Sequence, residues 1–423
     1  VRAGYRDVTR LTLNMESRLA ESFGSLMEWH PVEDVEVCLQ VGEDGKSGIL
    51  CRKDGKMLKS VPSRLGKKPY VLEVKEAHKR LKDQYSRTRA MMENAMEDGT
   101  GFQVSEVMEL LKNPVVRPIL EPLVYVKEGH IGFLQRRKDA LGLGTWDGRY
   151  AALKPDEEIR IAHPLDLYRE GTWHEYQKYL FDHELRQPFK QVFRELYVKL
   201  AEELGQRFSR MFAGNQIQPA KTVGCLRGRR WVADYEDGLQ KIYYKENIIA
   251  RIYAMADWFS PSEIEAPALE WVEFSDRKTF RALTIEEVPD LIYSEVMRDV
   301  DLAVSVAHAG GVDPETSHST IEMRRAIVEF NLPLFGIQNV ELTGSHALIK
   351  GSRAVYNVHL GSGVIHQEGG AMLNILPVHS QKRGKLFLPF VDEDPKTAEI
   401  MSKIVLLAED KKIKDPFILD QIH

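Results

Sequence analysis

The sequence is poor in several features that would define a class of protein. Its 423 residues contain only three cysteines, Cys38, Cys51 and Cys225, an odd number at no metal-ligand spacing. This count excludes a disulfide framework and fits a reducing compartment. No run of eighteen or more apolar residues occurs and the N-terminus lacks the layout of a signal peptide, so the sequence predicts no transmembrane helix. Together these absences predict a cytoplasmic protein.

An excess of charge of either sign is also missing. The chain has 58 Lys and Arg against 63 Asp and Glu, a formal net charge of −5. The chain as a whole therefore has no electrostatic reason to bind a polyanion, and we expect no direct nucleic-acid binding. The basic run RGRRW at 227–231 is the one partial exception.

Two catalytic signatures are absent as well. There is no GxSxG elbow of the kind that carries a nucleophilic serine. The Gly-Ser-Gly at 361–363 lacks the Lys and the following helix of a P-loop. The sequence therefore identifies no cofactor and leaves open whether the protein is an enzyme.

What is present predicts a globular α+β protein of two or three domains. Hydrophobic residues make up 43% of the chain and charged residues 29%. Clusters of antiparallel β meanders alternate with helical clusters without β-α-β order, and a sheet and helix close the chain. The regions expected are an N-terminal α+β region with a meander and a long helix (1–163), a helical and β-hairpin region (164–336) and a C-terminal antiparallel sheet with a terminal helix (337–423).

Periodicity and turn residues predict the individual elements. Asp44-Gly45 favours a two-residue hairpin turn, which would set Cys38 opposite Cys51. Ser319 and Glu322 have the spacing of a capping box, and Asp394-Pro395 suits the start of the closing helix. The elements expected are a meander over 35–61, a helix over 70–97, short helices within 103–127, strands over 123–162, a helix over 188–204, strands within 221–275, helices over 289–308 and 320–331, and a sheet over 337–391.

Histidines gather in the last quarter of the chain, around HLGSGVIHQEGG at 359–370. With Gly351-Ser352 as a hairpin turn, His346 and His359 become diagonal neighbours about 7–8 Å apart on one sheet face. Glu341 or Glu368 would complete a zinc-type set. Against this, no HxxxH or HxH spacing exists, and hydrogen-bonded structural histidines are the plainer interpretation. His379 lies between this block and the closing helix.

Two further candidates are open between a ligand role and a structural one. The N–H groups of Gly361 and Gly363 would cradle a phosphate, or the Gly-Ser-Gly is a plain hairpin turn. The acidic run 392–394 would bind Mg²⁺ or Ca²⁺, or Asp394 simply caps the closing helix.

A polar face on the 289–308 helix gives the last candidate. Glu295, Arg298 and Asp301 are spaced i, i+3, i+6 and so share a face, a pattern typical of intrahelical ion pairs. With Ser294 one turn earlier, the same face would also hold an anion.

Several segments resemble a known family. QPFKQVFRELYV at 187–198, SEVMRDVDLAVSVA at 294–307, YNVHLGSG at 356–363 and the segment 388–419 resemble the C-terminal region of the bacterial MolR-like (molybdate metabolism regulator-like) family. Members are of unknown function and many carry a WGR domain. The chain begins at Val1 rather than Met, which together with the resemblance implies the C-terminal part of a longer protein.

The sequence then supports two functions of different classes. The first is a binding or regulatory module whose partners are proteins or other domains of a longer chain. The alternative is an enzyme acting on a nucleotide or NAD-type substrate, with a pocket around His359, Ser362, His366 and Arg298.

Overall fold

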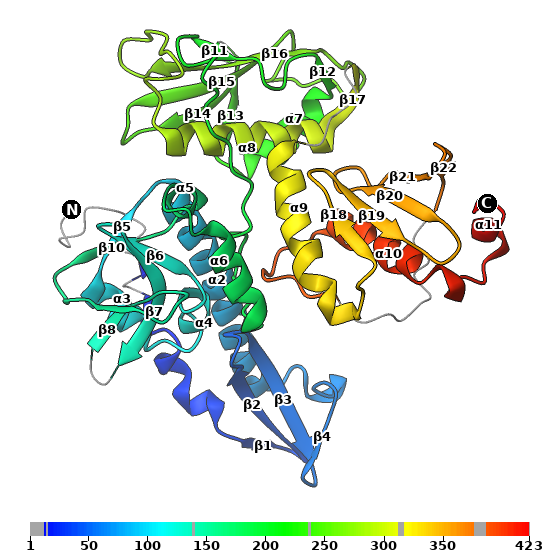
Figure 1. The fold of residues 1–423 in the computed structure, drawn as a ribbon. Coiled ribbons are helices and arrows are strands. Elements are labelled where there is room, and N and C mark those ends of the chain that lie inside the picture. The colour runs from blue at the N-terminus through cyan, green and yellow to red at the C-terminus, as the bar shows by residue number, and fades with distance from the viewer. Residues whose placement is uncertain are drawn as a thin grey trace. The chain divides into compact units, whose positions relative to one another are not determined.

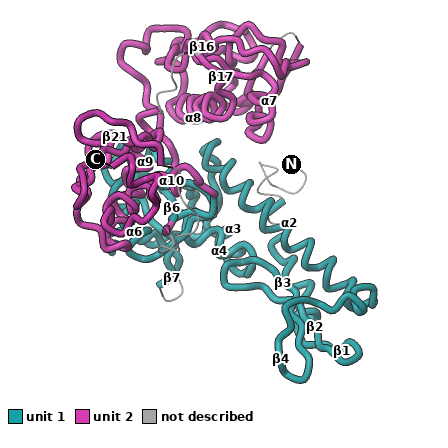
Figure 2. The backbone as a smooth tube through the Cα atoms, turned by 90° about the vertical axis from the view of Figure 1, so that its right-hand side faces the viewer, with its two compact units in different colours: residues 1–193, 388–392 teal, residues 194–387, 393–423 magenta. Residues whose placement is uncertain are grey.

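The structure is a computed structural model that describes residues 12–13, 16–137, 140–235, 238–311, 317–375 and 386–422. The chain divides into two compact units, residues 1–193 with 388–392 and residues 194–387 with 393–423 (Figure 2). This division does not test the three regions expected from the sequence, which stay a prediction. The described residues contain four large apolar cores, two in each unit.

The first core of unit 1 lies between a four-stranded meander and the long helix α2. The elements are the 3₁₀ helix η1 (Glu21–Met27), β1 (His30–Val32), β2 (Val35–Val41), β3 (Ser47–Lys53), β4 (Lys56–Met57), η2 (Ser63–Leu65) and α2 (Pro69–Glu97). Val74, Ala77 and Leu81 lie on one face of α2 and are buried against Val37 and Leu39 of β2. Gly99 closes the helix at φ +59°, as its position after a helical pattern predicts.

The second core of unit 1 lies beneath a six-stranded antiparallel sheet in the order β5-β10-β6-β7-β8-β9. The elements are β5 (Gly101–Gln103), α3 (Val104–Leu110), α4 (Arg117–Leu120), β6 (Val124–Lys127), β7 (His130–Arg137), β8 (Ala140–Gly144), β9 (Tyr150–Ala152), β10 (Glu158–Ile161), α5 (Pro164–Arg169) and α6 (Trp173–Asp182). The two short helices and the β segment expected here are confirmed.

The helix expected over 188–204 is wrong, since this segment is irregular. Its glutamines bond to backbone groups that a helix would not reach. Gln191 Oε1 accepts from Val124 N at 2.9 Å, and its Nε2 donates to Val124 O and Ala162 O at 2.7 and 2.8 Å. Phe189, Val192 and Phe193 are all fully buried. The apolar residues up to Tyr197 thus belong to a stretch that is buried on most sides, whereas Val198 and Leu200 are exposed.

The first core of unit 2 lies between a five-stranded sheet, in the order β11-β16-β15-β14-β13, and the helices α7 and α8, which Figure 1 shows along one side of it. The elements are β11 (Phe208–Ser209), β12 (Asn215–Ile217), α7 (Pro219–Arg227), β13 (Trp231–Asp234), β14 (Gly238–Tyr243), β15 (Ile248–Ala254), β16 (Leu269–Asp276), α8 (Asp290–Ala307) and β17 (His308–Gly311). Strands β12 and β17 form a separate two-stranded ribbon.

The second core of unit 2 is the C-terminal sheet β18-β19-β20-β21-β22 with α9 and α10. The elements are α9 (His318–Asn331), η3 (Pro333–Phe335), β18 (Val340–Leu342), β19 (His346–Lys350), β20 (Val355–His359), β21 (Ile365–Gln367), β22 (Met372–Leu373), α10 (Pro395–Ala408), η4 (Asp410–Lys412) and α11 (Pro416–Leu419). The closing helix starts as expected, since Asp394 accepts from Thr397 N at 3.0 Å.

The α+β class with antiparallel meanders is confirmed, because all the sheets of the described chain are antiparallel. One helix start differs from the expectation. Ser317, not Ser319, caps α9, and the Ser319 hydroxyl donates to Leu196 O instead. No helix in the described part of the chain combines the length and apolar character needed to cross a membrane.

Candidate functional site

Three histidines share one face of the C-terminal sheet. The register sets His346 of β19 directly opposite His359 of β20, with ring centroids 4.8 Å apart. His366 of β21 pairs with Asn357, two residues before His359, so it lies diagonally on the same face. The opposite face carries Ala347, Ile349 and Val358, which are fully buried in the core with α10. We call His346, His359 and His366 the histidine face.

The direct pairing corrects the diagonal arrangement expected from a turn at Gly351-Ser352. The loop between β19 and β20 has four residues, 351–354, because it wraps around the buried carboxylate of Asp410. Asp410 accepts from Ser352 N at 3.0 Å, from Arg353 N at 2.6 Å and from the Tyr356 hydroxyl at 3.1 Å. The two extra loop residues shift the register by two residues, so His346 and not residue 344 pairs with His359, and both histidines stay on the same face.

Ser362 and the two glycines form the turn after β20. His359 Nδ1 accepts from Ser362 N at 3.0 Å and lies 2.9 Å from Ser362 Oγ. Gly363, at φ +73°, donates its N–H to His359 O at 2.8 Å. The N–H groups of Ser362 and Gly363 therefore point back into the turn. The phosphate-binding role of Gly361 and Gly363 is not tested by this geometry and stays a prediction.

Two cations from other elements fix this turn through its carbonyls. Arg324 of α9 donates from Nη1 to Gly361 O at 2.6 Å, and Lys403 of α10 donates to Gly363 O at 2.9 Å. Neither contact could be predicted from the sequence, because each joins residues from separate elements that share no motif. Arg324 is the functional candidate that sequence reasoning missed.

The environment favours the neutral form of the paired histidines. Burial is the main cause that lowers the pKa of His359, followed by the nearby charges of His346 and Arg324. Burial also lowers the pKa of His346, with a smaller contribution from His366. Because His359 Nδ1 accepts an N–H, the proton of its neutral ring is on Nε2. The ring therefore offers an N–H donor and not a metal-binding lone pair at Nε2.

A metal set does not assemble from the described residues, where no group of three His, Cys, Asp or Glu is arranged to hold an ion. Glu368 donates its backbone N–H to Val355 O, which places it four residues along β20 from His359, about 13 Å at the usual strand rise. Glu368 is therefore remote from the His346–His359 pair. His379 lies outside the described residues.

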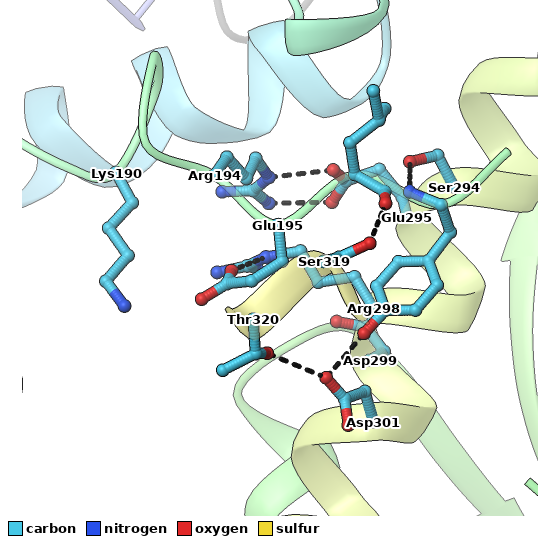
Figure 3. Close-up of polar contacts among 12 residues, drawn as sticks. Lys190, Arg194, Glu195, Ser294, Glu295, Arg298, Asp299, Asp301, Ser319 and Thr320 are labelled. Atoms are coloured by element: carbon cyan, nitrogen blue, oxygen red, sulfur yellow. Dashed lines mark hydrogen bonds and ion pairs between the residues drawn. The ribbon is translucent and has the colours of Figure 1, made fainter. Parts of the chain in front are cut away.

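Arg298 lies in a different group of side chains, along α8 (Figure 3). Its Nε donates to Glu195 Oε2 at 2.8 Å. Arg194 makes a two-pronged ion pair with Glu295 at 2.7 and 2.6 Å, and both side chains have 0% exposure. Tyr197 N donates to Ser294 Oγ at 3.1 Å. The polar face expected on this helix thus binds the extended segment 194–197, and we call this group the α8 polar cluster.

The far end of the α8 polar cluster is a buried carboxylate. Asp301 Oδ2 accepts from the Tyr197 hydroxyl, from Ser317 Oγ at 2.9 Å and from Thr320 Oγ1 at 3.3 Å. Burial outweighs these donors and raises the pKa of Asp301. Burial and the charge of Asp301 also raise the pKa of Tyr197 well above its usual value. Arg194, Glu295 and Asp301 take their partners from the fold itself, which is typical of a structural network.

The side of α8 that faces the five-stranded sheet carries another buried charge. Asp299 Oδ2 accepts from Lys241 Nζ at 2.7 Å and from Trp231 Nε1 at 2.9 Å, and Oδ1 accepts from Arg229 Nη1 at 3.2 Å. Lys241 and Asp299 are almost fully buried. This contact holds β13 and β14 on the helix.

The five-stranded sheet has an exposed apolar end, which the sequence did not point out. At the end where β13 meets β14 and β15 leaves the sheet, Tyr235 is 81% exposed and Ile264 is 96% exposed. The Phe259 ring meets the Tyr235 ring edge-on, with centroids 6.2 Å apart. Met255 is exposed in the same loop, which connects β15 to β16. We call Tyr235, Met255, Phe259 and Ile264 the apolar end.

Comparison with known proteins gives two matches to family models. Residues 55–231 match the model of a domain of unknown function (DUF4132), and residues 321–422 match that of a second domain of unknown function (DUF7737). No curated protein and no solved structure matches the chain.

These matches overturn the family resemblance inferred from the sequence motifs. The two family models are unrelated to MolR-like or WGR proteins, so the assignment to the MolR-like family was wrong. The short segments behind that assignment include 294–307, whose buried residues are those needed to pack α8. Buried helix patterns of this kind recur in unrelated folds.

Proposed function

We propose that this chain is a binding module and that the apolar end of its five-stranded sheet docks a protein partner. The observation that supports the proposal is the exposure of four large apolar side chains after β13 and in the β15–β16 loop, with the rings of Tyr235 and Phe259 in contact. Soluble proteins rarely expose large side chains in a contiguous group without a binding role. The partner is a protein segment with apolar and cationic side chains.

The loop of the apolar end is held in place rather than loose. Asp257 Oδ1 accepts from Phe259 N and Ser260 N at 3.0 and 2.9 Å, and Ser262 Oγ accepts from Ile264 N at 3.2 Å. Strand β12 also anchors this loop, since Ile217 N of β12 donates to Pro267 O at 3.1 Å. A pre-organised loop lowers the entropy lost on binding, which favours docking on this surface.

The charge around the apolar end determines the kind of partner. Residues 255–268 contain Asp257, Glu263 and Glu265, all exposed, and no Lys or Arg. An acidic rim around apolar residues complements a segment that alternates apolar and basic side chains. An anionic membrane surface would instead be repelled.

A titration with designed peptides tests this proposal. The probe is a fluorescent amphipathic helical peptide of Lys and Leu, compared with a Glu and Leu peptide of the same pattern. We expect the cationic peptide to bind the wild-type chain, and we expect the double variant Phe259→Asp with Ile264→Asp to bind about tenfold more weakly, because the loss of two central apolar contacts typically costs at least 1.4 kcal/mol.

The matched control places the same charges on exposed apolar residues elsewhere in unit 2. Leu334 and Phe417 are 66% and 65% exposed, so Leu334→Asp with Phe417→Asp alters net charge equally. The proposal fails if the control weakens binding as much, if the acidic peptide binds equally well, or if the wild-type chain binds neither peptide.

The enzymatic alternative, a nucleotide or NAD-type substrate near His359, rests on one contact. Ser362 Oγ lies at nucleophile–base distance from His359 Nδ1, but the same lone pair accepts the Ser362 N–H. A ring nitrogen used in this way is a poor general base for that hydroxyl. A thermal-shift measurement with NAD, ADP-ribose and nucleotides tests the alternative, since a shift lost in His359→Ala would favour an enzyme.

A further inference from the structure

The opposite end of the five-stranded sheet has a contrasting composition. It consists of the residues before β13, the β14–β15 turn and the segment after β16. The exposed cations and rings gathered there, together with the half-buried Arg277, are Arg227, Arg230, Tyr244, Lys245, Lys278 and Phe280. We call this group the basic end, and it includes the RGRRW run at 227–231, to which the docking surface assigns no role.

We propose that the basic end binds single-stranded nucleic acid. The proposal is independent of the apolar end and goes beyond the docking of a protein partner. It also departs from the expectation drawn from net charge, because binding depends on the local charge and not on the total of −5.

The register of the sheet brings the parts of the basic end together. Trp231 pairs with Lys241 and Tyr243 pairs with Ile248, so Arg230 lies beside the last residues of β14. Ile248 pairs with Asp276, so the segment after β16 lies beside the β14–β15 turn. Arg277 N donates to Asn247 O at 2.9 Å, which joins these two segments directly.

The balance of charge at the basic end is positive. Glu246 and Asp276 are the acidic groups at this end, and Glu287 is paired with Arg281 at 2.9 Å. Arg229 is also neutralised, by Asp299. Even without Arg230, the cations Arg227, Lys245, Arg277 and Lys278 exceed the described carboxylates at this end by two. Phosphates are the natural counterions for such a surface.

Exposed aromatic rings distinguish this surface from a merely basic one. Tyr244 is 71% exposed, and the Arg277 guanidinium lies 5.4 Å from its ring centroid. Phe280 is 66% exposed and has φ +56°, a left-handed backbone conformation that is uncommon for a bulky residue. The fold thus maintains a strained backbone at a position where the side chain is exposed to solvent, which is typical of functional residues.

Rings beside arginines are the groups that single strands require. Unpaired bases stack on exposed aromatic faces, while Arg and Lys contact the phosphates. A duplex keeps its bases stacked on each other and would not use Tyr244 and Phe280. The loop that presents Phe280 is held by Asp276, whose Oδ1 accepts from Thr279 N at 2.7 Å and from Lys278 N at 3.0 Å.

Fluorescence anisotropy with labelled oligo-dT tests the proposal on the full chain. We expect binding that weakens with salt with a log–log slope of about −2 to −3, as expected for three or four phosphate contacts on a single strand. Lys245→Glu with Lys278→Glu should weaken binding at least tenfold at low salt. Tyr244→Ser with Phe280→Ser should weaken binding about fivefold or more with the slope unchanged, because stacking does not depend on counterion release.

Controls separate this surface from general charge effects. Lys411→Glu with Lys414→Glu changes net charge equally at exposed positions near the C-terminus and should leave the affinity unchanged. A duplex of the same length should bind more weakly than oligo-dT. The proposal is overturned if oligo-dT does not bind at low salt, if the control variant loses as much affinity, or if the aromatic variant binds normally. Tighter binding to anionic vesicles than to oligo-dT, lost in the same variants, would overturn it in favour of a membrane surface.

Discussion

The α8 polar cluster and the histidine face are both groups of ionisable side chains in unit 2, but they differ in burial and in partners. In the cluster, Arg194 and Glu295 have no exposure, and each of these two side chains neutralises the charge of the other. On the histidine face, His346 and His359 are half-buried, and each stands beside a group that carries the same charge when protonated.

This difference separates structural charge from charge that can respond to conditions. A buried ion pair costs several kcal/mol to break, because one partner is left as an uncompensated charge in a medium of low dielectric constant. A half-buried imidazole changes its protonation state at a small cost, and its surroundings set the pH at which it does so. The α8 polar cluster therefore holds the segment 194–197 on the helix, whereas the histidine face is a surface whose charge depends on pH.

Removing the carboxylate of Glu295 is the strongest test of the structural role of the α8 polar cluster. Glu295→Gln leaves the Arg194 guanidinium buried without its counter-charge, and we expect it to lower the free energy of unfolding by about 3–5 kcal/mol. Urea denaturation followed by tryptophan fluorescence measures this, since Trp231 and Trp258 are buried in the core that contains α8.

A double variant separates the destabilisation caused by a single unpaired charge from the contribution of the ion pair to the free energy of unfolding. Arg194→Met with Glu295→Met removes both charges and should cost less than Glu295→Gln alone. Glu329→Gln, at an exposed position on α9, should change the free energy by no more than about 0.5 kcal/mol. A cost below 1 kcal/mol for Glu295→Gln would show that the pair is not structural.

Asp410 offers the next largest effect, because it fixes the loop that aligns the histidine face. Asp410→Ala leaves Ser352 N, Arg353 N and the buried Tyr356 hydroxyl without their acceptor. We expect a loss of about 2–3 kcal/mol from these charge-assisted bonds. Circular dichroism in urea measures the loss, and the exposed Asp420→Ala is its control. Unchanged imidazole NMR shifts of His346 and His359 would contradict the role of Asp410 in aligning the two rings.

The sequence was a good guide wherever side-chain periodicity follows one buried face. Helix α2 and the closing helix α10 match their expected ranges closely, since each buries a single apolar stripe and has a readable start or end. The helix predicted over 188–204 was wrong because this segment does not bury a single face. Its apolar spacing resembles a helix, but Gln187 and Gln191 supply hydrogen bonds to the backbone, and tertiary contacts override the local pattern.

The register of the hairpins was the other feature that the sequence predicted poorly, because the register depends on the length of the connecting loop. The turn at Asp44-Gly45 was expected to have two residues, yet Val41 pairs with Ser47 and Gly42 N donates to Lys46 O, which makes a three-residue loop with Gly45 at φ +76°. Cys51 therefore pairs with Val37 and not with Cys38. The candidate site depended on the same kind of register, and the contact that corrected it, Asp410, lies 57 residues from Arg353.

The pH dependence of folding stability tests whether the ionised, buried carboxylate of Asp301 destabilises the α8 polar cluster. The pKa of Asp301 is raised in the fold above its ordinary value of 3.8, so the folded state binds more protons than the unfolded state above that value. The contribution of Asp301 to the free energy of unfolding is therefore fully present below pH 3.8. It is lost as the pH rises through the pKa that Asp301 has in the folded state. The melting temperature of Asp301→Asn should therefore improve relative to wild type between pH 4 and 7. A constant difference across that range would show that its donors compensate for burial.

The smallest effect, and the one that sharpens the comparison most, is the titration of the histidine face. Burial and neighbouring cations lower the pKa of His359 and of His346 below 6.5. The unfolded state then binds more protons, so stability is fully present above pH 6.5 and is lost as pH falls through the folded pKa values. NMR titration of the imidazole signals measures both midpoints directly.

His346→Asn should raise the midpoint of His359, because it removes the neighbouring charge, and Arg324→Gln should raise it less. If neither variant moves the midpoint, burial alone sets the pKa of His359, and the rings do not act as a coupled pair. In that case the face differs from the α8 polar cluster only in exposure.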